Sequence, residues 1–345
     1  MKYRKLGRTD IDVSVICLGT MTWGEQNTEA EGWEQMDYAL DKGINFFDTA
    51  ELYSTPARAE TYGSTETIIG TWLASRKNRE KVIIGTKIAG PGSYTKHIRD
   101  TDIYTRQYIQ DAIDGSLRRL QTDYIDLYQI HWPERSANFF GKKNYEHQED
   151  GWADNFKMRL EMLHKNMASG KIRHIGISNE TPWGALNYLK LSDQFDLPRI
   201  DSIQNPYNLL NRSYEIGLAE ISIREQCGLL AYSPVACGRL TNKYIEKTDT
   251  ENCRLNKFKQ YQRYNSDNCL LATQQYYDIA KSAGLSLAQL AISWVCQQPF
   301  VTSNIIGATT MAQLKENIAS ADINLDDKII KKVNQINGLI SNPAS

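Results

Sequence analysis

Four polar side chains of complementary chemistry lie at or just after the ends of three consecutive apolar runs of the sequence. Asp48 ends the run 44–48 and Tyr53 lies five residues later, Lys87 follows the run 82–86, and His131 follows the run 125–130. A carboxylate and an ammonium at neighbouring strand ends can pair, which is the least costly way to keep Lys87 charged in a dry site. A charged lysine beside a phenol stabilises the phenolate, so we expect the pKa of Tyr53 to lie below its ordinary value of about 10. Tyr53 could then act as a general acid near neutral pH, and His131 could orient or polarise a carbonyl oxygen.

Each of these residues also has an ordinary structural explanation. An aspartate after a strand often caps a turn, a lysine at a strand end is usually a solvated tip, and a histidine before Trp-Pro often only packs. The combination of all four on three successive strands favours the chemical interpretation.

The elements that must position these residues are short apolar runs alternating with helical patterns. The runs are near-continuous, as is typical of parallel strands buried on both faces. There are eight of them: Val15–Gly19, Ile44–Asp48, Val82–Thr86, Ile125–Ile130, Ile172–Ile177, Ile200–Gln204, Leu229–Tyr232 and Asn304–Gly307.

The helical segments have recognisable ends. Capping boxes begin at Thr28, Ser286 and Thr310, and Thr181 is an N-cap followed by proline. Apolar residues at helical spacing predict further helices over 105–120 and 158–167, and the first helix is expected to stop near Gly43. Before the first apolar run, Tyr3–Lys5 and Ile11–Ser14 are expected to form a small hairpin around 7–10.

Eight strand–helix units predict a single α/β domain over residues 1–345, built as a (β/α)₈ TIM barrel with an N-terminal β-hairpin. A doubly wound dinucleotide fold would need an early G-x-G-x-x-G, and Gly19 and Gly24 do not form one. Three long connections, 54–64, 132–154 and 234–267, each follow a strand and should therefore hang over the carboxyl-terminal face. Loops of this length are usually functional or mobile, although plain surface decoration is the alternative.

Composition excludes several other classes. Lys plus Arg is 40 and Asp plus Glu is 41, a net charge of −1, which argues against a nucleic-acid-binding protein. The six cysteines and five histidines show no metal-site spacing, so we expect free thiols in a reduced, intracellular protein without metal. The N-terminus shows no secretory signal and no run approaches the length of a membrane span. We therefore expect a soluble cytoplasmic protein.

Several segments together resemble the aldo-keto reductases. The resemblance is carried by Phe47–Tyr53, by Thr86-Lys87, by Gln129–Pro133 and by Ile306–Asn317, and it runs from about residue 1 to residue 335. The longer stretch between Tyr53 and Thr65 is similar to the Tas-like subgroup, which is related to the potassium-channel β subunits. This stretch, with Arg58 and Glu60, and the long connection after the fourth strand leave the substrate range open.

The resemblance implies a barrel that binds NADPH in an extended form and transfers hydride to an aldehyde or ketone. Tyr53 would be the proton donor, Lys87 and Asp48 would tune it, and His131 would orient the carbonyl. The residues implied to bind cofactor are Gly19, Thr20, Met21, Ser178, Asn179, Gln204, Tyr232, Ser233, Val235, Ala236, Cys237, Lys243, Arg254, Gly307, Thr309, Gln313, Glu316 and Asn317.

Two of these assignments have a specific chemical reason. Lys243, and Arg254 beyond it, match the segment that holds the adenosine phosphate end, and a cation there favours NADP over NAD. The strand leading into the helix at Thr310 would present free N–H groups and a positive dipole end to phosphate. Gln313 could equally serve only in the capping box, and Lys243 could be an ordinary surface lysine.

The expected partner is a small carbonyl compound. Aromatic residues near the four polar groups, namely Trp23, Trp132, Phe139, Phe140 and Trp152, would suit an apolar or aromatic substrate, or could simply anchor the loops.

Two other classes of function compete with a reductase. One is a regulatory protein that keeps the fold and the cofactor, as in the potassium-channel β subunits. In that branch we would expect the histidine position to be altered, whereas this sequence has His131 there. The other is a metal-dependent barrel hydrolase, which would need His-x-His or clustered carboxylates at strand ends, and the sequence has neither.

Overall fold

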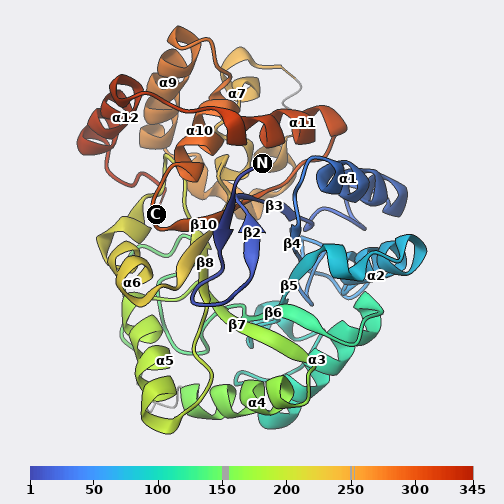
Figure 1. The fold of residues 1–345 in the computed structure, drawn as a ribbon. Coiled ribbons are helices and arrows are strands. Elements are labelled where there is room, and N and C mark those ends of the chain that lie inside the picture. The colour runs from blue at the N-terminus through green and yellow to red at the C-terminus, as the bar shows by residue number, and fades with distance from the viewer. Residues whose placement is uncertain (150–154, 249–250, 252, 345) are drawn as a thin grey trace.

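Eight parallel strands close into a barrel in this computed structural model, which describes residues 1–149, 155–248, 251 and 253–344. Neighbouring strands follow the order β10-β3-β4-β5-β6-β7-β8-β9, so the last strand closes on the first, and helices surround the barrel (Figure 1). The barrel strands are β3 Ile16–Gly19, β4 Phe46–Asp48, β5 Ile83–Ile88, β6 Ile125–Ile130, β7 Ile172–Ser178, β8 Ser202–Pro206, β9 Gly228–Tyr232 and β10 Val301–Ile306. The predicted (β/α)₈ barrel is confirmed.

Seven of the eight strands differ from their predicted bounds by one to three residues at an end, and β8 runs over Ser202–Pro206 instead of Ile200–Gln204. β4 begins at Phe46 rather than Ile44, and β10 begins at Val301, three residues before the predicted start. β5 continues to Ile88, so Lys87 lies inside the strand instead of following it. A lysine is tolerated there because its charge is neutralised by Asp48 on the neighbouring strand, a contact that a local pattern does not contain.

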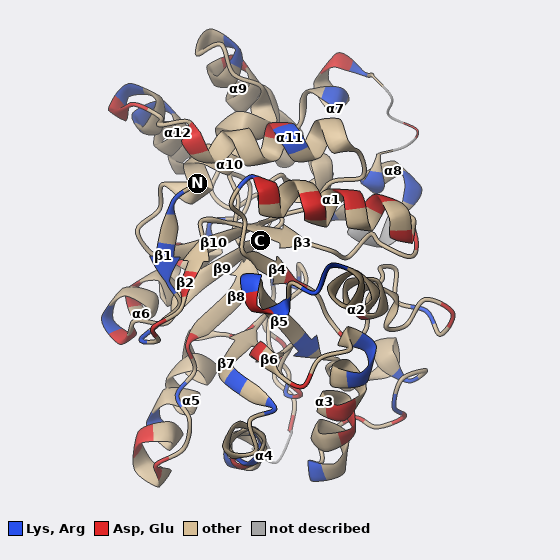
Figure 2. Ribbon diagram, turned by 45° about the vertical axis from the view of Figure 1, so that its right-hand side comes forward, with Lys and Arg blue, Asp and Glu red and all other residues tan. Residues whose placement is uncertain are grey.

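The longer helices pack on the outside of the barrel between successive strands. They are α1 Glu29–Asp41, α2 Ser64–Arg76, α3 Arg106–Leu120, α4 Phe156–Ala168, α5 Pro182–Phe195, α6 Leu218–Glu225, α9 Asp267–Ser282, α10 Leu287–Cys296, α11 Met311–Ala319 and α12 Asp327–Leu339, with the shorter α7 Asn242–Glu246 and α8 Arg254–Lys257 in the loop after β9. Acidic side chains line much of α1, while both signs of charge are spread over the other outer helices (Figure 2).

The helix caps follow the sequence with one exception. Thr28 with Glu31 and Ser286 with Gln289 form reciprocal capping boxes. The box predicted at Thr310 is only half formed, because the Gln313 side chain accepts hydrogen bonds from the backbone N–H and hydroxyl of Thr309 rather than from its N-cap residue. Gln313 therefore ties the end of the strand–helix loop to α11.

The predicted hairpin closes the amino-terminal end of the barrel. β1 Tyr3–Lys5 and β2 Asp12–Ser14 pair antiparallel and lie across the barrel opening in Figure 1. Leu6 and Val13 pack against Cys17, Phe46 and Leu127, which point into the barrel interior. Because this apolar plug fills the amino-terminal end, polar chemistry is left to the opposite face, where barrel sites occur.

No single helix in the described part of the chain is both long and apolar enough to cross a membrane. α9 and α10 would meet that criterion only if they were taken together, and they are bent by 92° with respect to each other.

Candidate active site at the carboxyl end of the barrel

Asp48 and Lys87 form a buried ion pair at the carboxyl ends of adjacent strands. Lys87 Nζ lies 2.7 Å from Asp48 Oδ2 and also donates to the backbone carbonyl of Thr49 at 2.7 Å. The Lys87 side chain is 0% exposed, so its charge is compensated by these two oxygens in a dry environment.

Tyr53 lies above this pair, and His131 lies beside it. The ammonium of Lys87 is 5.2 Å from the ring centroid of Tyr53, and the rings of Tyr53 and His131 are 5.8 Å apart in an edge-to-face arrangement. The structure therefore brings together all four residues that the sequence singled out. Burial, and after it the charge of Lys87, lower the pKa of His131 well below its ordinary value, so its imidazole is neutral at physiological pH. Its Nδ1 is buried and has no hydrogen-bond partner among the described residues.

Two glutamines support the carboxylate of Asp48. The Gln204 amide donates to Asp48 Oδ1 at 2.8 Å and to Gln129 Oε1 at 3.2 Å, while the Gln129 amide lies 3.4 Å from the same Asp48 oxygen. Gln204 was expected to contact the cofactor, and in this structure it orients Asp48. Gln129 was not among the candidate residues, although its position two residues before His131 on β6 was available as a signal.

Glu51 is a second buried carboxylate that the sequence analysis did not single out. Its Oε2 accepts a hydrogen bond from the Ala89 N–H at 2.9 Å, and its Oε1 lies 2.6 Å from an Arg99 nitrogen. Its own N–H donates to the carbonyl of Lys87 at 3.0 Å. Glu51 therefore fastens the segment leading to Tyr53 onto β5. Its place between Asp48 and Tyr53 was the only hint that the sequence offered.

Four residues expected at the nicotinamide end lie together. Ser178 donates to the Gln204 carbonyl at 2.7 Å, and the Asn179 amide donates to the His131 carbonyl at 2.9 Å. The Tyr232 hydroxyl donates to Asn179 Oδ1 at 2.6 Å. The carboxyl ends of β6, β7, β8 and β9 are thereby joined into one hydrogen-bonded rim next to His131.

The segment after β9 adopts an uncommon backbone. Ser233, Ala236 and Cys237 have φ angles of 57°, 49° and 56°, in the left-handed region that non-glycine residues rarely occupy. Val235, between Ser233 and Ala236, has an ordinary φ of −100°. Such conformations persist only where the surroundings impose them, and they concentrate at ligand-binding segments.

The end of β3 contributes the other side of this rim. Gly19 ends the strand, and the Thr20 hydroxyl donates to the Asp48 carbonyl at 3.0 Å. The Met21 sulfur lies 3.6 Å from a guanidinium nitrogen of Arg254, which begins α8. Arg254 therefore reaches across from the loop after β9 to the loop after β3. Lys243 lies in α7, earlier in the same loop.

The last expected cofactor segment leads from β10 into α11. A side chain added at Gly307 would meet nothing within 4 Å, so the backbone is open on that side. Thr309 is held by Gln313, the Asn317 amide donates to the Gly307 carbonyl at 3.1 Å, and Glu316 accepts from the Ser286 hydroxyl at 2.5 Å.

The aromatic residues divide between the mouth of the barrel and the core. Trp132 packs with Leu52, Ala89 and Tyr53, and its ring lies 5.7 Å from that of Phe140, which contacts Phe139 in turn. Any side chain at Gly90 would collide with the Trp132 indole, so the absence of a Cβ there permits this packing. Trp23 is not brought to this group: it is fully buried in the main core, where its Nε1–H donates to Gln35. Trp152 lies outside the described residues.

These residues fit a nicotinamide dinucleotide on structural grounds. The orphaned Nδ1 of His131, the left-handed turn at 233–238 and the open backbone at Gly307 lie on the carboxyl-terminal rim of the barrel. A hydrogen-bonded amide cluster next to His131, and open space beside the backbone at Gly307 ahead of α11, are features that suit a carboxamide and a diphosphate.

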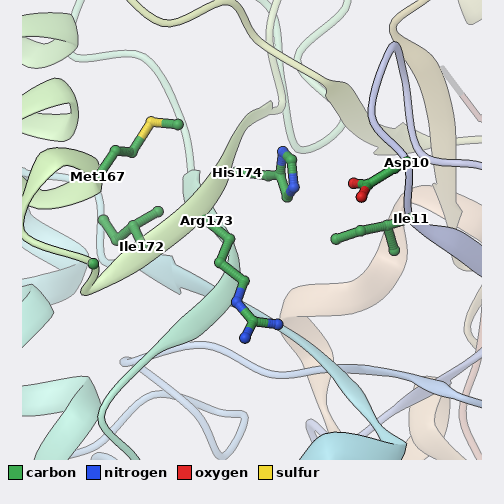
Figure 3. Close-up of a pocket in the computed structure, with 7 residues that line it drawn as sticks. Asp10, Ile11, Met167, Ile172, Arg173 and His174 are labelled. Carbon is green, nitrogen blue, oxygen red and sulfur yellow. The ribbon is translucent and has the colours of Figure 1, made fainter.

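A pocket of about 490 Å³ lies at the amino-terminal end of the barrel, opposite the four reactive side chains (Figure 3). It is lined by Asp10 and Ile11 of the hairpin turn and by the first three residues of β7, Ile172 to His174. Because β7 ends at Ser178 on the tetrad side, this pocket is remote from the four reactive side chains. No group of His, Cys, Asp or Glu in the described residues has the arrangement of a metal site.

The fold and the four convergent side chains define a barrel oxidoreductase with a Tyr-Lys-Asp-His site. The sequence profile of the Aldo/keto reductase family matches residues 15–338, and the chain belongs to this family. It is 46% identical to Protein tas of Escherichia coli over the full length of both chains. It is also 32% identical to the uncharacterised oxidoreductase YrpG of Bacillus subtilis, covering 97% of this chain and 96% of that protein.

Two more distant relatives bear on the open alternatives. A probable voltage-gated potassium channel subunit β of Arabidopsis thaliana is 29% identical over 97% of this chain and 96% of its own length. An NADH-specific methylglyoxal reductase of Escherichia coli is 28% identical over 95% of each chain. The expected relation to the Tas-like and potassium-channel β branch is thus confirmed, and one of these relatives is named for the reduction of a carbonyl compound, methylglyoxal.

Proposed function

We propose that this protein reduces aldehydes or ketones to alcohols with NADPH, using Tyr53 as proton donor. The observation that carries the proposal is the fully buried ammonium of Lys87, paired with Asp48 at 2.7 Å and lying 5.2 Å from the Tyr53 ring. A reduction leaves negative charge on the carbonyl oxygen, and a proton must reach that oxygen.

The residues divide this work between them. The nicotinamide, when bound, supplies the hydride. Tyr53 gives its phenolic proton to the carbonyl oxygen, and the positive charge of Lys87 lowers the cost of the phenolate that remains. Asp48, oriented by Gln204, keeps Lys87 charged and in place. His131, neutral because it is buried beside Lys87, can donate a hydrogen bond to the carbonyl oxygen without competing as an acid.

The preference for NADPH over NADH rests on cations in the loop after β9. Lys243 in α7 and Arg254 in α8 both belong to this loop, and a cation complements a 2′-phosphate. The relative named as NADH-specific shows that the family does not fix this choice, so the two cofactors must be compared directly.

The decisive experiment is a titration of NADPH and NADH against intrinsic tryptophan fluorescence, followed by turnover with a panel of aldehydes. NADPH binding with turnover supports a reductase. NADPH binding without any turnover favours the second candidate, a cofactor-binding regulatory protein, for which the potassium-channel relative is the argument. Absence of binding by either cofactor would contradict both.

We also propose a cytoplasmic location. All six cysteines are free thiols, five of them buried, as is usual in a reducing compartment. Fractionation of the producing cell followed by immunodetection tests this directly.

A further inference from the structure

Arg263 lies between the two longest loops over the carboxyl-terminal face. It belongs to the short helix Lys259–Tyr264 in the loop after β9. Its aliphatic stem packs against Gly141 of the loop after β6, because a Cβ added at Gly141 would lie 3.2 Å from the Arg263 Cδ. Its guanidinium lies 5.1 Å from the centroid of the Tyr264 ring, and the side chain of Tyr232 is one of its close neighbours.

Among the residues that the structure describes, no carboxylate forms an ion pair with this guanidinium, and the Arg263 side chain is partly buried. The guanidinium of Arg263 stays charged at any physiological pH. A partly desolvated cation without a counter-anion is costly, which makes an anionic ligand favourable at this position.

Two chains of contacts lead from Arg263 toward the reacting centre. Through Tyr232 and Asn179 it connects to the backbone of His131 by contacts of 2.6 Å and 2.9 Å. On its other side, Gly141 follows Phe140, whose ring lies 5.7 Å from that of Trp132. It therefore stands between the expected nicotinamide tyrosine and the aromatic residues expected to receive substrate.

The expected phosphate end of the cofactor involves other residues. Arg254, in the same loop as Arg263, contacts Met21 of the loop after β3, and Lys243 lies in α7. We therefore expect an anionic group at Arg263 to belong to the substrate and not to the diphosphate of the cofactor.

We propose that Arg263 binds an anionic group of the substrate, so that the preferred substrates are carbonyl compounds carrying a carboxylate. This inference rests on the proposed reductase function and names its substrate class. The carbonyl would meet Tyr53 and His131, while the carboxylate, at the other end of a short chain, would pair with the guanidinium in the bidentate manner typical of arginine.

The test compares two aldehydes that differ only in charge, succinic semialdehyde and its methyl ester. The wild-type protein should prefer the acid. Arg263→Gln should lower kcat/KM for the acid by about 10- to 100-fold, the usual effect of losing a charged hydrogen bond, and leave the ester nearly unchanged. Arg263→Lys should recover part of the preference. Arg58→Gln is the matched control, because Arg58 lies on another loop of the same face and is paired with Glu25.

Equal losses for acid and ester would overturn the proposal, as would a large loss of NADPH affinity with the preference for the acid unchanged. A binding measurement separates this inference from the proposed function. Succinate should quench tryptophan fluorescence of the wild-type protein and bind at least tenfold more weakly to Arg263→Gln. If no carbonyl is reduced but this difference appears, the anion site stands and the reductase function fails. If reduction occurs but succinate binds both proteins equally, the anion site fails and the reductase stands.

Discussion

Lys87 Nζ lies 2.7 Å from Asp48 Oδ2, and neither side chain is more than 4% exposed. The two residues come from adjacent strands, β5 and β4, whose register places Asp48 opposite Gly85. Lys87 is therefore two residues further along its strand, and its long side chain reaches back to the carboxylate. This pair is the fixed point around which Tyr53 and His131 are arranged.

Replacing Lys87 should test how much this pair contributes to the fold. Lys87→Met leaves Asp48 buried without a counter-ion, so the free energy of unfolding should fall by about 3–5 kcal/mol. Urea denaturation followed by far-UV circular dichroism measures it. Lys171→Met is the matched control, since Lys171 and Asp114 are as close, at 2.6 Å, but each is more than 30% exposed. Its cost should stay within about 1 kcal/mol. Equal losses in the two variants would contradict the buried-pair argument.

Tyr53→Phe should separate proton donation from cofactor binding. It removes only the hydroxyl, so NADPH affinity should be retained while kcat falls by about 10²–10⁴-fold. Steady-state turnover and a fluorescence titration on the same preparation provide the two readouts. Tyr94→Phe, at a half-exposed ring next to Trp132, should change neither. Unchanged turnover in Tyr53→Phe would remove Tyr53 from the proposed mechanism.

The lowered pKa of His131 gives stability a defined pH dependence. In the unfolded chain the imidazole titrates near its ordinary pKa of about 6.5, whereas burial and Lys87 keep it neutral in the folded state to lower pH. Below about pH 6.5 the unfolded state therefore binds a proton that the folded state does not, and stability falls as the pH falls.

Between pH 7 and pH 5 the free energy of unfolding of the wild-type protein should therefore fall by about 2 kcal/mol more than that of His131→Gln. Urea denaturation at the two pH values gives the difference. His164→Gln, at an exposed position on α4, should lose as much stability as the wild-type protein. The same pH dependence in all three proteins would mean that His131 is not the responsible group.

Glu51→Gln should show whether the second buried carboxylate holds the Tyr53 segment. The amide can still accept the Ala89 N–H, but the charge facing Arg99 is lost. We expect a loss of about 1.5–3 kcal/mol in the free energy of unfolding, since the hydrogen bond to a charged group is weakened in a buried site. Glu220→Gln, which breaks an exposed pair with Arg224 on α6, should cost less than about 1 kcal/mol. The midpoint of thermal unfolding ranks the variants.

Lys243→Ala tests the choice of cofactor. Loss of a cation near a 2′-phosphate should weaken NADPH by about tenfold or more and leave NADH nearly unchanged. Fluorescence titration with both cofactors measures the ratio of the two dissociation constants, and a ratio unaltered by the substitution would show that Lys243 does not recognise the phosphate. Lys247→Ala, just beyond α7 and exposed, is the control.

The sequence by itself determined the barrel and the identity of the reactive rim. Near-continuous apolar runs are typical of strands buried on both faces, and eight of them alternating with capped helices predicted the closed barrel that the structure has. Because parallel strands end at the same face, residues at their carboxyl ends must converge. Asp48, Tyr53, Lys87 and His131 could therefore be grouped before any coordinates were known.

Only the tertiary structure decided which polar groups share a partner. Gln129, Gln204 and Glu51 act through side-chain contacts between strands and loops far apart in sequence, and no local pattern records such contacts. The same is true of Trp23, whose aromatic character suited a pocket but whose position against α1 buries it in the core. Local sequence preferences determine where the chain turns and which residues it buries. Strand register and loop packing determine which polar side chains contact a given charged group, and these depend on the tertiary structure.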